Sequence, residues 1–167
     1  MPQAVYRIEN GPMVTTAAPV KVTTGTAIKT MLQLAPTTLP ISVIEWGISF
    51  DGIALATPIE CELLTTGTIF ATVTASAAAD IVNLSDPSGT APSLTLSTTG
   101  TGYTSSAEGT IVATRELDFQ LVQPLTQYLK QYPLGQESNI IPGQSLRIRV
   151  TAAAAVNAYC YIVFTQG

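Results

Sequence analysis

The chain has 167 residues, of which 46% are hydrophobic and only 11% are charged, and its net charge is −4. This length is enough for one domain with a full core and argues against two large domains. An ordinary soluble domain carries roughly 25% charged residues. We therefore expect copies of the chain, or a larger assembly, to cover part of the uncharged surface.

The composition also excludes several kinds of site. Histidine is absent and there are two cysteines, so a Ser-His-Asp or Cys-His catalytic centre, a His-based zinc site and a Cys₄ cluster within one chain are impossible. Seven scattered basic residues in an acidic chain argue against nucleic-acid binding. We predict a protein without enzymatic activity, cofactor or metal.

Residues 1–18 show no sustained alternation and contain Gly-Pro and Ala-Pro pairs. They predict an extended N-terminal arm that can reach a neighbouring subunit, with Val5, Tyr6 and Ile8 as apolar anchors. A frayed terminus is the alternative. The segment lacks the basic start and apolar run of a secretion signal, so synthesis in a cytoplasm is expected.

Threonine, valine and isoleucine are frequent, and proline and glycine recur between the apolar runs, which favours an all-β protein. Residues 41–50 form the first clear strand, with Ile44, Trp46, Ile48 and Phe50 on one face and Trp46 as the anchor of the core. In the next strand Ile59, Cys61 and Leu63 alternate with two glutamates. Further strands are expected at residues 20–24, 28–34, 68–74, 93–97 (weak), 110–115, 117–123, 145–152 and 158–165.

Two segments do not follow the strand pattern. Residues 75–109 are rich in Ala, Ser, Thr and Gly and predict a long exposed excursion, either mobile or in contact with a neighbour. Leu125, Tyr128, Leu129 and Tyr132 have helical spacing, but a proline on each side limits them to a single turn.

Eight or nine short strands without an amphipathic helix predict a sandwich or barrel that occupies residues 19–167 as a single domain. Residues 150–167 form an apolar-rich run without charged residues. Polar residues interrupt this run, and its residue types favour strands. It therefore does not predict a membrane span.

Two residue pairs are candidates for chemistry. Glu60 and Glu62 share one strand face at roughly 7 Å, a separation that a glycosidase can use, although an exposed polar face gives the same pattern. Cys61 and Cys160 are both expected to face inward. They could form a disulfide between strands, but two buried thiols in a reducing compartment are the stronger interpretation.

Three segments carry a resemblance: Glu-Trp-Gly-Ile-Ser-Phe-Asp-Gly at 45–52, Tyr-Pro-Leu-Gly at 132–135 with Ile-Pro-Gly-Gln-Ser-Leu-Arg-Ile-Arg-Val at 141–150, and Ala-Val-Asn-Ala-Tyr at 155–159. In these the chain resembles small virion proteins of tailed bacteriophages, in particular those of actinobacterial phage structural operons. The similarity spans most of residues 15–167, with nothing specific at 75–109.

This resemblance implies a capsid decoration, or head-stabilising, protein with a tumour-necrosis-factor-like jelly roll of two antiparallel sheets. It further implies a homotrimer bound to the major capsid protein on the virion surface. Trimer-interface candidates are Tyr128, Tyr132, Tyr159 and Tyr161, because tyrosine is enriched at interfaces; alternatively, they line the rim of their own sheet. The alternative function is a receptor- or glycan-binding module of a tail or fibre that uses residues 75–109, where Tyr103 is the single aromatic residue. A carboxylate-based glycan hydrolase ranks third.

Overall fold

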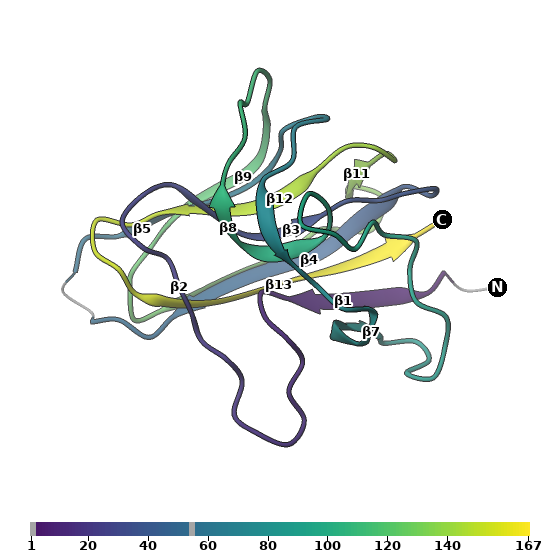
Figure 1. Ribbon diagram of the computed structural model, residues 1–167, viewed down its shortest axis with the longest axis horizontal. Coiled ribbons are helices and arrows are strands. Elements are labelled where there is room, and N and C mark those ends of the chain that lie inside the picture. The colour runs from purple at the N-terminus through teal and green to yellow at the C-terminus, as the bar shows by residue number, and fades with distance from the viewer. Residues whose placement is uncertain (1–2, 54–55) are drawn as a thin grey trace.

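The computed structural model describes residues 3–53 and 56–167 and contains two antiparallel sheets stacked on each other (Figure 1). The all-β class and the two antiparallel sheets predicted from the sequence are therefore confirmed. The described residues form thirteen strands and a single 3₁₀ turn, η1 (Ala78–Asp80). Eight or nine strands were predicted, and the additional strands are short ones of three to six residues, such as β1, β7, β8, β10 and β11.

The larger sheet has seven strands. Five of them follow the order β10-β4-β13-β1-β7, while β11 pairs with β4 and β2 pairs with β13. Their bounds are β1 (Val5–Glu9), β2 (Val22–Thr23), β4 (Ile41–Phe50), β7 (Ile81–Asn83), β10 (Gln127–Gln131), β11 (Ser138–Ile140) and β13 (Asn157–Gln166).

The smaller sheet has six strands in the order β6-β8-β3-β12-β5-β9. Their bounds are β3 (Lys29–Leu34), β5 (Ile59–Thr65), β6 (Thr72–Ala75), β8 (Gly102–Ala107), β9 (Arg115–Val122) and β12 (Leu146–Thr151). In Figure 1 this sheet lies above β1, β13 and β7 of the larger sheet.

Eight of the strands pair in a nested order. β1 pairs with β13, β3 with β12, β4 with β10 and β5 with β9, all of them antiparallel. The first half of the chain thus pairs with the second half, as in one long hairpin that has been wound into two sheets. The pairing joins segments that are far apart in sequence and brings both termini to the same end of the molecule (Figure 1).

The core lies between the two inner sheet faces, and Trp46 is fully buried in it. Ile48 and Phe50 are buried as the alternation predicts, but Ile44 is not, and Val43 is buried in its place. The cause is a β-bulge, since the pairing of β4 with β13 jumps from Glu45 to Val43. An extra residue at a bulge reverses which side chains face the core.

The prediction of an extended N-terminal arm over residues 1–18 is wrong for Val5–Glu9, the segment that contains all three predicted anchors. Val5–Glu9 is strand β1, inserted between β13 and β7. Tyr6 is 7% exposed and Ile8 is fully buried, and the Tyr6 ring stacks on Phe164. These two side chains belong to the chain's own core, so they cannot anchor a partner, while Val5 is half-buried. The loop that follows, residues 10–21, projects from the sandwich at the bottom of Figure 1. Residues 1 and 2 lie outside the described residues.

The excursion predicted at residues 75–109 contributes strands to both sheets. β7 extends the seven-stranded sheet beside β1, and β8 with β6 extends the six-stranded sheet beside β3. The weak strand expected at residues 93–97 is reduced to one isolated bridge between Pro36 and Leu94. Residues 110–114 form a loop before β9 rather than a strand. Together, residues 66–114 form an insert between β5 and β9.

Candidate functional site

The outer face of the seven-stranded sheet carries the most distinctive group of side chains. Along β13, the outward Tyr159, Tyr161 and Val163 alternate with fully or nearly fully buried residues. Strand β1 lies beside it and presents Arg7 and Glu9 on the same face. We call these side chains, together with Glu45 and Gly47 of β4, the tyrosine face.

Tyr161 lies flat on the sheet because its neighbour on β4 is a glycine. Gly47 pairs with Tyr161, and a Cβ atom added to Gly47 would lie 2.7 Å from Tyr161 Cε1. The Tyr161 hydroxyl donates a hydrogen bond to Glu45 Oε1 at 2.6 Å. Burial raises the pKa of Tyr161 to about 12, and the bond to the Glu45 carboxylate adds to the increase. The ring is thus held in one orientation.

Arg7 connects the two tyrosines. Its guanidinium carbon lies 4.6 Å from the centre of the Tyr161 ring, and its Nη2 donates to the Tyr159 hydroxyl at 2.6 Å. The same Nη2 lies 3.5 Å from Glu9 Oε1. A cation over an aromatic ring is worth about 0.5–1 kcal/mol at exposed sites. The face is therefore ordered by contacts among three strands, although its side chains stay partly open to solvent.

Tyr128 and Tyr132 are placed differently from the other two predicted interface tyrosines. Tyr128 packs edge-on against Trp46, with ring centres 5.4 Å apart, and both Tyr128 and Tyr132 pack against the core. The Tyr128 hydroxyl and Trp46 Nε1 donate to Asp118 Oδ2 at 2.9 and 3.1 Å. Asp118 belongs to β9, so this cluster joins the neighbouring edges of the two sheets. Tyr128 and Tyr132 are therefore engaged with the core, although Tyr128 also lines a small pocket of about 80 Å³ together with Tyr159 and Tyr161.

The outer face of the six-stranded sheet differs, because the insert covers the part that β3 and β12 form, whereas Phe119 and Leu121 of β9 stay 40% and 62% exposed beside β5. Arg147 of β12 is fully buried; its Nη1 lies 3.2 Å from Glu108 Oε2, and its Nη2 donates to the Ile69 carbonyl at 2.5 Å. Gln33 is also fully buried and bonds through its amide to Gly100 O at 2.6 Å and to Ala71 N at 2.8 Å. Burial lowers the pKa of Arg147, while Glu108 acts in the opposite direction. No sequence pattern pointed to these residues.

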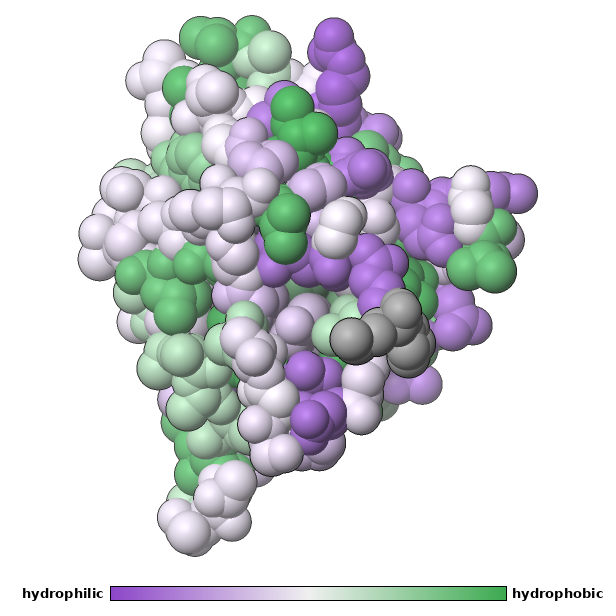
Figure 2. Space-filling model, turned by 90° about the vertical axis from the view of Figure 1, so that its right-hand side faces the viewer, coloured by the Kyte–Doolittle hydropathy of each residue, from purple (hydrophilic) through white to green (hydrophobic). Residues whose placement is uncertain are grey.

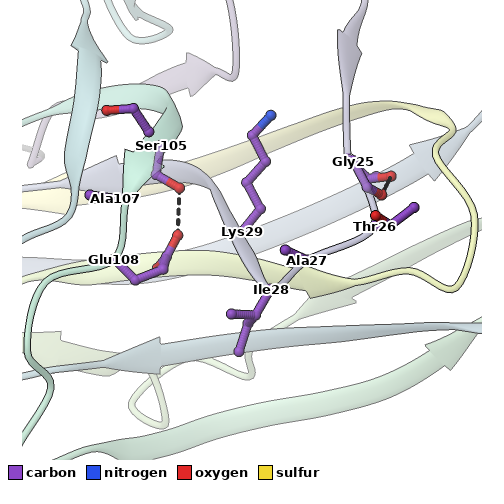
Figure 3. A pocket seen from close by; sticks show the side chains of 10 residues that line it. Gly25, Thr26, Ala27, Ile28, Lys29, Ser105, Ala107 and Glu108 are labelled. Atoms are coloured by element: carbon purple, nitrogen blue, oxygen red, sulfur yellow. Dashed lines mark hydrogen bonds between the residues drawn. The ribbon is translucent and has the colours of Figure 1, made fainter.

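A cavity of about 350 Å³ opens beside Glu108, between residues 24–29 and 105–108 (Figure 3). Glu108 is turned toward Ser105 in this view, and its two oxygens accept bonds from Ser105, Thr30 and Arg147. Lys29 extends away from Glu108, and its Nζ donates to the Thr23 carbonyl at 3.0 Å. The charged groups of this cavity therefore bind the chain itself and fasten the insert.

The carboxylate pair predicted on β5 does not form a catalytic arrangement. Glu62 lies against Arg149, with Oε2 and Nε 2.8 Å apart, and Glu60 is exposed on the same outer face. Cys61 and Cys160 lie on strands of opposite sheets, and both are free and buried. Within residues 3–53 and 56–167, no group of three or more Cys, Asp or Glu side chains is arranged to hold a metal ion.

A groove of about 330 Å³ lies at one end of the tyrosine face, between the β1–β2 loop and the start of β13. Its lining includes Val20, Lys21, Asp51, Asn157 and Tyr159. No signal in the sequence suggested it, because its walls come from three separate segments.

The comparisons with known proteins give no name to this arrangement. No protein-family model, curated protein or solved structure matches the chain. In the part of the chain that the structure describes, no helix has the length and apolar character needed to cross a membrane.

Proposed function

We propose that this chain is a structural protein that associates as a homotrimer through the tyrosine face and decorates the outside of a phage capsid, stabilising the shell. The observation that carries the self-association is the tyrosine face itself. Tyr159 and Tyr161 are held in place on the outer face of a sheet, yet they and Val163 remain only partly buried. Tyrosine combines a large contact area with a polar end and is enriched at protein interfaces.

The charge of the tyrosine face fits a second copy of the chain. The face carries Arg7 together with the carboxylates Glu9 and Glu45, so opposite charges can meet when copies are related by a symmetry axis. Leu129, 54% exposed on β10, borders the face next to Gly47. Leu129 thereby adds to the aromatic and apolar area that forms the centre of a typical subunit contact.

The rest of the surface supports an assembled state. Figure 2 shows separate green hydrophobic areas at the top, the left edge and the lower left, with near-white areas between them, while purple groups lie mainly in the centre and on the right. Val112 is 82% and Ile53 is 73% exposed. Such a surface is more easily explained when neighbouring subunits cover part of it.

Nested strand pairing supports a jelly roll as the finer description of the fold. A jelly roll arranges eight strands in two sheets, and here β1, β4, β10 and β13 share one sheet while β3, β5, β9 and β12 share the other. The capsid as the partner, the virion surface as the location and the synthesis in a host cytoplasm rest on the resemblance to phage virion proteins.

Light scattering coupled to size exclusion tests the trimer. The wild-type chain is expected at three chain masses, and Tyr161→Asp is expected to elute as a monomer because it removes the aromatic contact area and places an additional negative charge on the tyrosine face of every copy. Leu134→Asp is the matched control, since it places the same charge on an exposed turn away from the tyrosine face. A monomeric wild-type chain over a wide concentration range, combined with no co-sedimentation with undecorated capsids, would refute the proposal.

A further inference from the structure

The groove at the end of the tyrosine face has both apolar and polar lining. Its apolar residues include Ala18, Pro19 and Val20 of the β1–β2 loop, while Phe50 and Ala158, which also line it, are less than 10% exposed because they belong to the core. The volume of about 330 Å³ is at the lower end of the range for small-molecule sites, roughly 300–1,000 Å³. It therefore admits one or two sugar-sized rings.

Tyr159 lines the groove, and its hydroxyl is engaged by a residue outside the groove lining. The hydroxyl accepts a bond from Arg7 Nη2 of β1 at 2.6 Å. A bond between the hydroxyl and Glu9 contributes to the raised pKa of Tyr159, whose largest cause is burial. Because its polar end is engaged, the ring is fixed and presents an apolar surface to a ligand.

The rim supplies hydrogen-bonding groups of both kinds. Asp51 Oδ2 accepts bonds from Lys21 Nζ at 2.5 Å and from Asn157 Nδ2 at 3.2 Å. The hydrogen bond from Lys21 is the main reason why the pKa of Asp51 is lowered. The carboxylate is therefore a charged acceptor beside amide and ammonium donors, and the Ser49 hydroxyl lies nearby in the lining.

We propose that this groove binds a neutral saccharide. A sugar ring has an apolar C–H face that stacks on an aromatic side chain, and hydroxyl groups around its edge that both donate and accept hydrogen bonds. Tyr159 offers the first kind of contact, and Asp51 with Asn157 offers the second. The Asp51 carboxylate disfavours an acidic sugar or a phosphate. The groove is open in the single chain and does not need the capsid, but Tyr159 also belongs to the tyrosine face, so a trimer that covers Tyr159 would compete with the sugar.

Titration of the ¹⁵N-labelled full chain, followed by NMR, tests the proposal. The probes are glucose, galactose, N-acetylglucosamine and their β-linked disaccharides, with an uncharged tripeptide as the comparison. At least one sugar is expected to give saturable shifts at the amides of Val20 and Asp51 and at the side-chain amide of Asn157. Tyr159→Ala is expected to weaken that binding at least about tenfold, equivalent to about 1.4 kcal/mol, whereas Tyr159→Phe keeps the ring and stays within about threefold.

Asn157→Ala removes a rim donor and is expected to weaken binding, while Leu134→Ala, far from the groove, is the matched control. The proposal is overturned if no sugar gives a saturable shift, if the shifts map elsewhere, if Tyr159→Ala binds as tightly as the wild type, or if the tripeptide alone binds. Light scattering on the same samples reports the oligomeric state separately, so the failure of the sugar site and the failure of the trimer can be told apart.

Discussion

The chain covers part of the outer face of one sheet and leaves the outer face of the other sheet open. On the six-stranded sheet, residues 66–114 fold over the polar side chains of Arg147 and Gln33, which become fully buried and bonded. On the seven-stranded sheet, Tyr159 and Tyr161 are ordered by Arg7 but stay half-exposed. The β3–β12 part of one face is thus covered within the chain, whereas the tyrosine face is left as a surface, as are Phe119 and Leu121 of β9 at the far edge of the six-stranded sheet.

Because of this difference, the residues that control the stability of the fold are expected to differ from those that control association with other molecules. A buried charge that loses its partner strongly destabilises the fold, so residues of the covered face are expected to control unfolding. Partly exposed contacts contribute little to stability, so residues of the tyrosine face are expected to control contacts with other molecules. The predictions below start with the core that both sheets share and end at the open face.

The largest loss of stability is expected for Trp46→Ala. Trp46 is fully buried between the sheets and donates its indole N–H to Asp118, and truncation of a buried Trp typically costs about 3–5 kcal/mol. Urea unfolding followed by far-UV circular dichroism measures this loss. Leu134→Ala, at an almost fully exposed position, should leave the free energy of unfolding within about 0.5 kcal/mol. A loss below about 1 kcal/mol for Trp46→Ala contradicts the role of Trp46 as the core anchor.

Glu108→Ala should be the most damaging change on the covered face. It leaves Arg147 fully buried without the carboxylate that now lies 3.2 Å from its Nη1, and breaking a buried pair costs about 3 kcal/mol or more. The matched control is Glu60→Ala, which removes an exposed carboxylate from the same sheet face. Equal losses in the two variants would show that the insert does not depend on the buried pair. Replacing both partners, with Glu108→Leu and Arg147→Met, should recover much of the stability.

Stability should also fall in alkaline solution, because burial raises the pKa of both thiols. The pKa of Cys61 is raised to about 12 from its usual 9.0, and that of Cys160 is raised as well. Between these values the unfolded chain loses the thiol proton while the folded chain keeps it, so the free energy of unfolding decreases as the pH rises above about 9. The slope is at most about 1.4 kcal/mol per pH unit for each thiol.

Unfolding in urea at a series of pH values between 8 and 11 measures this slope, to which the tyrosines with raised pKa values contribute in the same direction. The variant with Cys61→Ala and Cys160→Ala isolates the thiol contribution. An identical slope in this variant would mean that the thiols are not the groups that titrate.

Local alternation predicted the central strands of the fold but not the contacts that distinguish its two faces. The strand at Ile59–Thr65 was recognised because buried and exposed residues alternate there. Strand β10 was taken for a helical turn because Tyr128 and Leu129 also fit helical spacing, yet their side chains lie on opposite sides of the strand, next to Ile48 and Gly47. A run of five residues flanked by prolines is too short to distinguish the period of a helix from the two-residue period of a strand.

For β1 a usable signal was present. Tyr6 and Ile8 alternate with Arg7 and Glu9, and this short pattern was outweighed by the irregular residues that follow. The burial of Arg147 had no local signal, because the insert that covers it arrives from residues 66–114. The tyrosine face was predicted only in part: Tyr159 and Tyr161 were identified as interface candidates, but Arg7, Gly47 and Glu45 become their neighbours only through strand pairing.

The smallest effect on stability, with a clear effect on association, is expected for Gly47→Ala. The new methyl group would meet Tyr161 Cε1 at 2.7 Å, and the flexible Tyr161 side chain would tilt away from Arg7 and Glu45. An alanine in place of a strand glycine gains about 0.5–1 kcal/mol in conformational entropy, which offsets the lost contacts, so the free energy of unfolding should change by less than about 1 kcal/mol. The trimer of this variant should nevertheless dissociate at a higher protein concentration than the wild-type trimer, as measured by light scattering.

Tyr161→Phe is the control, since it keeps the ring in place and removes only the bond to Glu45. If Gly47→Ala instead destabilises the fold as strongly as Glu108→Ala while its trimer remains unchanged, the open face supports the fold rather than association, and the contrast between the two faces fails.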